Sequence, residues 1–394
     1  MTQSVLFFCG QPLVGQPISQ RVAAFGAYLA QQGWDVRLTA VDPAFAGTPF
    51  VEVDPISGLD VEVIGPTHYR VSPDGTRVST SPAAHLRECR DTARRLRDRA
   101  TEMGPERVLI STTHPSSLYA VGALRRSQSL WLDSDDWSAA HLLASGGGKL
   151  AGGVYDLLER VVPRGAQHIT VCSNELAGLL PHAMVVPNFI RLRDVPARPR
   201  GYGAGDGDDG AAGAKVRVTF PGSITTYYGH LPLLGALARR RTDCDTIDFR
   251  VIGNGAGLDD CRRLVASSGL DDVVTFTGRL DRAAMLEELV RADVSVLPLN
   301  DTRLDRARFP LKMLDALASG CALAASDVGM VHDTLTDGET ACLSPPGDMD
   351  ALVSNVLELA ADPDLRRRLS KAGRELVRDY DEDVVCGRWM ALLS

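Results

Sequence analysis

The sequence predicts an α/β protein with two domains, each built on a doubly wound parallel sheet. Its 394 residues are too many for one ordinary domain and suit two. A strand, a loop, a helix and a second strand open the chain, and a similar alternation begins again at Val216. A Gly-rich acidic stretch separates the halves. We therefore place an N-terminal domain at residues 1–198, a flexible linker at 199–215 and a C-terminal domain at 216–379.

Composition excludes several classes of protein. A net charge of −8 argues against nucleic-acid binding, which needs a concentrated basic face. No apolar run approaches the ~20 residues of a membrane span, and no signal peptide is evident at the N-terminus. The eight cysteines form no C-x-x-C motif, and several lie inside apolar runs. We expect buried reduced thiols, neither disulfides nor metal ligands, and a cytoplasmic protein.

The opening elements follow the pattern of a doubly wound sheet. Residues 4–10 form a short apolar run that ends in glycine, typical of a buried strand. A loop at 10–17 leads into a helix at 18–32, and a second strand follows at 35–41. The loop lacks a full G-x-G-x-x-G pattern, so we do not expect a dinucleotide site there.

An Arg-rich helix is expected at residues 83–103. One interpretation is a membrane-surface helix that meets a lipid-linked acceptor. The other is a solvated face crossed by ion pairs, which the interleaved acidic residues favour. The arginines are Arg87, Arg90, Arg94, Arg95, Arg97 and Arg99.

Two polar motifs follow strands in the N-terminal half. His114 comes after the strand at 107–112, where a group titrating near neutral pH could orient or deprotonate an acceptor hydroxyl. Alternatively, it is only the residue that precedes a helix starting at Pro115. Asp133 and Asp135 end another strand, and two such carboxylates could bind Mg²⁺ or Mn²⁺. We favour polar groups that line a cleft without metal, because the stronger ligand-binding signals lie in the C-terminal half.

The C-terminal half repeats the strand-then-glycine pattern. A strand at 216–220 runs into Gly222 and Ser223, and another at 249–253 runs into Gly253 and Asn254. Both glycines would allow the backbone to approach a ligand closely, or they serve only turn geometry. A third strand ends at Gly278 and is followed by Arg279 and Leu280.

The stretch FPLKMLDALASGCALAASD, residues 309–327, is the centre of the prediction. Lys312 and Asp315 are three residues apart and therefore lie on neighbouring turns of one helix face. Gly320 is placed to end that helix with a left-handed cap. The N–H groups at the helix N-terminus can bind an anion, a lysine there balances phosphate charge, and a carboxylate one turn further can hold a diol. Together these groups suit a nucleoside diphosphate attached to a sugar.

This segment resembles the donor-binding helix of glycosyltransferase family 4 and its GT-B relatives. Their pattern is Glu, seven residues and a second Glu, followed by an Ala-rich run, Gly and a strand. Asp315 matches the second glutamate, whereas Ala307 stands where the first is expected. The passages after residues 253 and 278 also resemble the family, and the likeness covers most of residues 216–361.

The resemblance implies two Rossmann-like domains that face a cleft, with a last helix at 380–394 that packs back on the N-terminal domain. It implies sugar transfer from a nucleoside diphosphate to a hydroxyl or amine of a small-molecule or lipid-linked acceptor, with retained configuration and without metal or cofactor. Asp315 would then hold the ribose, Arg279 and Leu280 the base, and His114 the acceptor. The diphosphate would lie against Lys312, the helix amides from Leu311 to Met313, and the turns Gly222-Ser223 and Gly253-Asn254.

The chain also departs from the family pattern. The loop at residues 222–229 carries no cation where the family places an Arg and a Lys, so we expect Lys312 to replace them, with Arg279, Arg306 and Arg308 in reserve. The missing carboxylate at Ala307 suggests a donor with a deoxygenated or unusually substituted sugar. The same losses leave a non-catalytic partner subunit open, and a GT-B sugar-nucleotide epimerase is a further alternative. Antibiotic and cell-envelope glycosylation are both compatible with the sequence.

Overall fold

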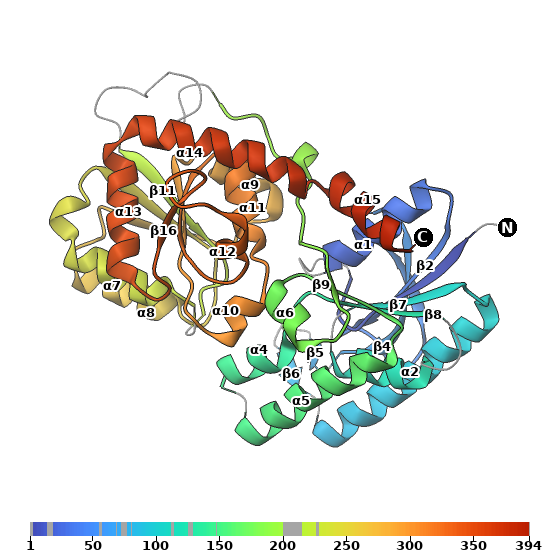
Figure 1. Cartoon of the computed structure of the whole chain (residues 1–394). Coiled ribbons are helices and arrows are strands. Elements are labelled where there is room, and N and C mark those ends of the chain that lie inside the picture. The colour runs from blue at the N-terminus through green and yellow to red at the C-terminus, as the bar shows by residue number, and fades with distance from the viewer. Residues whose placement is uncertain are drawn as a thin grey trace. The chain divides into compact units, whose positions relative to one another are not determined.

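A computed structural model shows two compact units, residues 1–188 with 385–394 and residues 189–384, which we call the N-terminal and C-terminal units (Figure 1). Most of the predicted linker, residues 200–214, lies outside the described residues. The structure describes residues 3–13, 19–54, 57–67, 69–71, 77–79, 81–111, 114–124, 129–146, 148–199, 215–225 and 228–393.

An eight-stranded sheet organises the N-terminal unit, in the order β10-β9-β8-β7-β1-β2-β4-β3. All neighbouring strands run parallel except β3 and β4. A separate two-stranded sheet pairs β5 with β6. The strands are β1 Ser4–Cys9, β2 Asp35–Asp42, β3 Phe50–Val53, β4 Asp60–Pro66, β5 Tyr69–Val71, β6 Arg77–Ser79, β7 Arg107–Ser111, β8 Ser129–Ser134, β9 His168–Val171 and β10 Met184–Val185.

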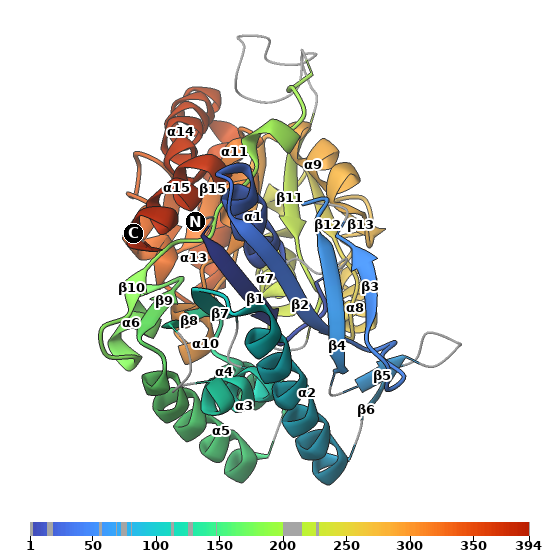
Figure 2. The same ribbon diagram turned by 90° about the vertical axis from the view of Figure 1, so that its right-hand side faces the viewer.

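Apolar strands account for the core of this unit. In β1 every residue from Val5 to Cys9 is buried, as expected for a central strand covered on both faces. Figure 2 shows the order of the strands and the helices around them. These helices are α1 Ser19–Gln31, α2 Pro82–Met103, α3 Pro115–Leu124, α4 Ser138–Ala144, α5 Lys149–Val161, α6 Asn174–Leu179 and the 3₁₀ segment η1 Val162–Gly165.

The end of the last helix, α15 (Glu382–Leu393), packs on the N-terminal unit. Trp389 is fully buried and stacks on Phe25 of α1 with ring centroids 4.0 Å apart. The Arg107 guanidinium donates to the Leu393 carbonyl at 2.6 Å. Burial of one large aromatic side chain in this way fixes the final helix with substantial apolar contact.

The Arg-rich helix α2 has the ion pairs that the interleaved acids indicated. Arg94 pairs with Asp91 at 3.0 Å, and Arg99 pairs with Glu62 at 2.7 Å and Glu102 at 2.8 Å. These contacts make α2 a solvated, ion-paired face. Across the described residues, no helix combines the length and apolar character that crossing a membrane requires. All eight cysteines are buried, and none of them is in a disulfide.

A six-stranded parallel sheet organises the C-terminal unit, in the order β13-β12-β11-β14-β15-β16. Strand order runs one way from β11 to β13 and the other way from β14 to β16. The reversal therefore lies between β11 and β14, where open α/β sheets bind ligands at their carboxyl ends. The strands are β11 Val216–Pro221, β12 Ile247–Ile252, β13 Val274–Gly278, β14 Val294–Leu297, β15 Ala322–Ser326 and β16 Cys342–Ser344.

Helices lie on both faces of this sheet (Figure 1), so the predicted α/β fold with two parallel-sheet domains is confirmed. One core cluster joins β11, β12 and β14 to helices on either side, with Phe220 and Phe249 fully buried in it. The helices are α7 His230–Arg239, α8 Leu258–Ser267, α9 Arg282–Val290, α10 Arg303–Ala307, α11 Leu311–Ala318, α12 Met330–Thr334, α13 Met349–Ala361 and α14 Pro363–Leu376.

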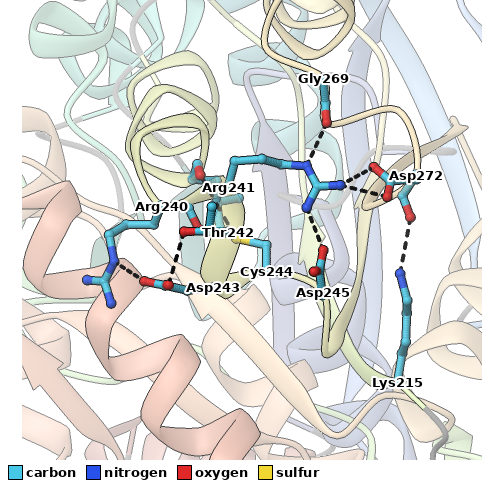
Figure 3. Close-up of polar contacts among 10 residues, drawn as sticks. Lys215, Arg240, Arg241, Thr242, Asp243, Cys244, Asp245, Gly269 and Asp272 are labelled. Atoms are coloured by element: carbon cyan, nitrogen blue, oxygen red, sulfur yellow. Dashed lines mark hydrogen bonds and ion pairs between the residues drawn. The ribbon is translucent and has the colours of Figure 1, made fainter.

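Ion pairs gather at the amino ends of β11, β12 and β13, the edge opposite the ligand-binding edge (Figure 3). Arg241 is their centre: it donates to the Gly269 carbonyl at 2.7 Å and pairs with Asp245 and Asp272. Lys215 donates to the Asp272 carbonyl. These exposed contacts join three connections at the amino edge of the sheet.

Candidate active site

Two glycine turns meet at the carboxyl ends of β11 and β12. Gly222 has φ 143° and Gly253 has φ 154°, conformations that only glycine adopts without strain. A Cβ added to Gly253 would lie 1.9 Å from the Gly222 carbonyl oxygen. The close approach that Gly253 permits in this structure is therefore between the two turns. Ser223 and Asn254 are exposed beside them, and Asn254 accepts a hydrogen bond from the Gly255 amide at 2.8 Å.

Lys312 lies directly over the first of these turns. A Cβ added to Gly222 would meet Lys312 Nζ at 3.0 Å. The same nitrogen is 5.3 Å from the ring centroid of Tyr228 and 5.8 Å from that of Phe220. Lys312 belongs to helix α11, which follows β14 and α10 in the chain. Strand β14 is next to β11, where the strand order of the sheet reverses. Lys312 and Asp315 share helix α11, as their spacing predicts, and the Lys312 side chain reaches Gly222 in the loop that lacks a cation.

The Lys312 ammonium has no hydrogen bond or ion pair with any of the described residues. Burial and the nearby Arg308 guanidinium lower its pKa to about 7, against a smaller opposite effect of Asp305. The two reserve arginines already have carboxylate partners: Arg306 pairs with Asp301 at 2.7 Å, and Arg308 pairs with Asp305. Lys312 is thus a half-buried cation that an incoming anion would stabilise.

The N-terminus of α11 lies at the same place. The preceding residue, Pro310, provides no side-chain cap. The Met313 amide donates to the Pro310 carbonyl at 2.9 Å, and the Met313 side chain is fully buried. Of the three amides predicted to bind the diphosphate, those of Leu311 and Lys312 therefore remain at the helix tip.

Asp315 lies one turn further along α11 and is 5% exposed. Both carboxylate oxygens accept hydrogen bonds from Arg282, the first residue of α9, at 2.9 and 3.4 Å. Burial raises the pKa of Asp315, and Arg282 opposes that effect. This partner is not predictable from local spacing, because Arg282 is 33 residues from Asp315. At the helix end Gly320 has φ 77°, which confirms the predicted left-handed stop.

The other predicted base-binding residues lie just before Arg282. Arg279 is exposed and Leu280 is half-buried, and both follow the last residue of β13. Within the described part of the chain, Arg279 makes no hydrogen bond or ion pair. The N-cap Asp281 accepts from the Ala284 amide at 2.8 Å and so fixes the start of α9.

Ala307 is fully buried at the end of α10. The nearest acidic residue in sequence, Asp305, is also buried, but its carboxylate accepts from the Asn300 amide at 3.0 Å and the Thr302 hydroxyl at 3.1 Å. It also pairs with Arg308. Thr302 is the N-cap of α10, and Asp305 joins the first turn of that helix to the preceding loop. Asp305 therefore does not replace the carboxylate that is missing at Ala307.

In the N-terminal unit, His114 lies where the strand order reverses between β1 and β7. It directly precedes α3, and a Cβ added to Gly10 would lie 3.0 Å from the His114 Cβ and 2.3 Å from the Ser117 hydroxyl. Gly10 directly follows β1, and the absence of a side chain there makes room for His114. This is the position at which a doubly wound sheet presents residues to a ligand.

The Asp-x-Asp motif has a structural use. Asp133 is fully buried, pairs with Arg21 at 2.7 Å and accepts from the Thr170 hydroxyl at 2.6 Å. Arg21 also donates to the carbonyls of Val186 and Pro187. Burial and the neighbouring Asp133 and Asp136 raise the pKa of Asp135 to about 8. The two carboxylates are therefore not both available as metal ligands, and no cluster of three His, Cys, Asp or Glu residues able to hold a metal occurs among the described residues.

Solved structures with the same architecture are glycosyltransferases of the GT-B class. The chain matches sucrose-phosphate synthase from Thermosynechococcus elongatus with a TM-score of 0.75 and 18% identity, over 99% of this chain and 98% of that one. It matches Anabaena HepE in complex with UDP with a TM-score of 0.71 and 14% identity, over 99% of both chains. The fold is therefore GT-B.

The sequence comparisons concern the part that carries Lys312 and Asp315. Residues 208–376 match the family model for glycosyl transferases group 1, which confirms the predicted resemblance for this part of the chain. A phosphatidyl-myo-inositol mannosyltransferase from Mycobacterium leprae is 31% identical over 158 residues, which is 40% of this chain and 40% of that protein. Residues 208–376 are thus similar to the group 1 glycosyltransferases, and the match spans well under half the length of that curated relative.

Proposed function

We propose that this protein transfers a sugar from a nucleoside diphosphate to a hydroxyl or amine of a small-molecule or lipid-linked acceptor. One observation carries the proposal: the Lys312 ammonium, which has no counterion among the described residues, lies between a glycine turn and a helix N-terminus at the switch point of the sheet. A diphosphate would supply the missing negative charge and accept hydrogen bonds from Lys312 and the two amides.

The chemistry follows from what these groups stabilise. As the bond between the sugar and the phosphate breaks, negative charge grows on the leaving diphosphate. The Lys312 ammonium and the amides of Leu311 and Lys312 would stabilise that charge at fixed positions, in place of a metal ion. A departing phosphate oxygen would then take the proton from an acceptor on the same face of the sugar, and the configuration would be retained. His114 would orient the acceptor, because its position marks the switch point of the N-terminal sheet.

Asp315 would hold the ribose. Each carboxylate oxygen has two lone pairs, so its bonds to Arg282 leave acceptor capacity for a ribose hydroxyl. Arg279 and Leu280 precede α9 and would lie beside the base. Gly222, Ser223, Gly253 and Asn254 would form the wall of the diphosphate site.

The buried Ala307 leaves the sugar without the carboxylate that the family uses. We propose a donor sugar that is deoxygenated or unusually substituted at the hydroxyl which that carboxylate would bind. A panel of nucleotide sugars in a transfer assay tests this part of the proposal. Turnover of ordinary UDP-glucose together with failure on every deoxysugar donor would contradict it.

Calorimetry with UDP, GDP and dTDP tests the main proposal. We expect one of them to bind, the affinity to fall about 10- to 100-fold in Lys312→Ala, and a fall also in Asp315→Ala. Arg239→Ala serves as the control, because this arginine is exposed at the end of α7 and pairs with Asp350. A fold that binds none of the three is the result expected of a non-catalytic partner subunit, the alternative that Ala307 and the cation-free loop keep open. The buried thiols suit a reducing compartment, so we propose that the reaction is cytoplasmic.

A further inference from the structure

Helix α5 of the N-terminal unit exposes its apolar face to solvent and buries its polar face. Its buried residues are Gly152 and Glu159, one without a side chain and one charged. Its large apolar residues are between 42% and 84% exposed: Leu150, Val154, Leu157, Leu158 and Val161. A surface helix normally buries its apolar stripe, so α5 is amphipathic in the reverse sense. We call these five residues the α5 stripe.

The polar side of α5 is fixed by specific contacts. The Glu159 carboxylate accepts from the amides of Ser138 and Ala139, at 3.0 and 2.7 Å, and so caps the N-terminus of α4. Arg160 pairs with Asp156 at 3.0 Å and lies 5.1 Å from the centre of the Trp137 ring. These bonds hold the helix in its rotation, because turning the stripe inward would leave the α4 amides without their cap.

The stripe is one continuous surface. At 100° per residue its members fall within an arc of about 100°, the width of an ordinary core-facing stripe. Leu143 of the neighbouring α4 lies against the opposite, buried face of α5, since a Cβ added to Gly152 would meet its side chain at 2.4 Å. The views in Figures 1 and 2 both show α5 at the outer side of its unit, beside α4.

The exposed charges at the two ends of α5 are both positive, although the whole chain carries −8. Lys149 at one end of α5 and Arg164, three residues beyond the other end, are exposed. Both acidic residues of the helix are withdrawn, Glu159 by burial and Asp156 by its pairing with Arg160. An apolar stripe with a cation at each end matches a surface of anionic phospholipid, whose headgroups attract the cations and whose acyl region accepts the leucines.

We propose that the α5 stripe docks the N-terminal unit on an anionic membrane surface. This inference goes beyond sugar transfer and needs neither the donor nor the acceptor to be known. It also replaces the Arg-rich helix α2 as the membrane candidate, because three of the six arginines of α2, Arg94, Arg97 and Arg99, pair with carboxylates. A second copy of the chain is the main competitor, since Leu150, Val154, Leu157 and Val161 have the 4-3-4 spacing of a coiled-coil seam. In either orientation of such a pair, however, cations at the helix ends would face cations.

Vesicle co-sedimentation tests the proposal, with the full chain and vesicles of phosphatidylcholine alone or mixed with phosphatidylglycerol. We expect binding to the mixed vesicles, weaker binding to phosphatidylcholine, and a loss of at least about tenfold in partitioning for Leu157→Glu. Leu86→Glu is the matched control, because Leu86 is 50% exposed on α2 and lies outside the stripe. Lys149→Glu should weaken binding only to the anionic vesicles.

Two further readouts make the test decisive. The circular dichroism spectrum and the melting temperature should be unchanged in Leu157→Glu, which shows that the variant is folded. Unchanged nucleotide diphosphate binding in the same variant separates this proposal from the donor-site proposal. The proposal would be overturned if wild-type protein does not bind anionic vesicles. It would also be overturned if Leu157→Glu and Leu86→Glu reduce vesicle binding equally. A wild-type dimer that Leu157→Glu converts to a monomer in sedimentation analysis, without vesicle binding, would assign the stripe to self-association instead.

Discussion

Arg282 donates to both carboxylate oxygens of Asp315, so the residue placed to hold the ribose is itself held by a side chain from another helix. The pair joins the first turn of α9 to the second turn of α11. These are the helices that follow the β13 turn, where the base is expected, and the β14 loop, where the diphosphate is expected. A shift of either helix would therefore move the predicted ribose and base contacts together.

The pair leads to a first prediction. Replacing Arg282 with alanine leaves the Asp315 carboxylate buried and without its partner, which raises its pKa further and lowers the free energy of unfolding by about 1–3 kcal/mol. Nucleotide affinity should fall in Arg282→Ala, and discrimination between a ribonucleotide and its 2′,3′-dideoxy analogue should shrink. Arg282→Lys should restore part of both. Unchanged discrimination in Arg282→Ala would show that Asp315 does not hold the ribose through this arrangement.

Lys312 leads to a prediction about pH. Its pKa of about 7 means that the ammonium is only partly charged at neutral pH in the free protein. A bound diphosphate favours the charged form, so affinity should be highest below pH 7 and should fall as the pH rises above it, with proton uptake on binding. Calorimetry at several pH values in buffers of different ionisation enthalpy measures both effects. In Lys312→Met the slope above pH 7 and the proton uptake should disappear, and their persistence would assign the titration to another group.

His230 leads to a prediction about acid stability. The side chain is fully buried, stacks on Phe220 with ring centroids 3.8 Å apart, and burial lowers its pKa to about 3. In the unfolded chain, His230 therefore takes up a proton near pH 6.5, whereas in the folded chain it does so only near pH 3. Stability should fall through this window by at most about 1.4 kcal/mol per pH unit from this group. In denaturant unfolding, the free energy of unfolding of His230→Phe should decrease less than that of wild type as the pH is lowered. An equal decrease would contradict the assignment to His230.

Arg21 leads to a prediction about the N-terminal unit. Burial opposes the charge of Arg21, but Asp133 outweighs that effect and raises its pKa. Arg21→Ala leaves Asp133 buried without its cation and should cost about 3–5 kcal/mol in urea unfolding. The control Arg94→Ala removes an exposed pair and should cost less than about 1 kcal/mol. Similar costs for the two variants would mean that the buried pair does not stabilise this unit as the geometry indicates.

The sequence predicted the parts of the site that depend on local spacing. Lys312 and Asp315 share a helix, and Gly320 ends it, so a helical period and one glycine were sufficient to place all three. The partners of these residues were not predictable, since Arg282 is 33 residues from Asp315 and Arg21 is 112 residues from Asp133. Such pairs form only when the sheet brings separate crossovers together, and nothing in the local pattern marks them.

Helix α5 shows a second limit of sequence reasoning. Hydrophobic periodicity identifies which side of a helix is apolar but not which side the fold buries. Here Glu159 is buried because it caps α4, and Leu157 is exposed as a consequence. In contrast, the fully buried Trp389 obeys the usual rule.

Sugar transfer by the proposed route requires a diphosphate at the tip of α11. A crystal structure of the protein soaked with the nucleoside diphosphate that binds in calorimetry tests this most directly. We expect phosphate density within hydrogen-bonding distance of Lys312 Nζ and the Leu311 amide, with the ribose against Asp315. Nucleotide density at another site, with Lys312 still without an anion, would contradict it.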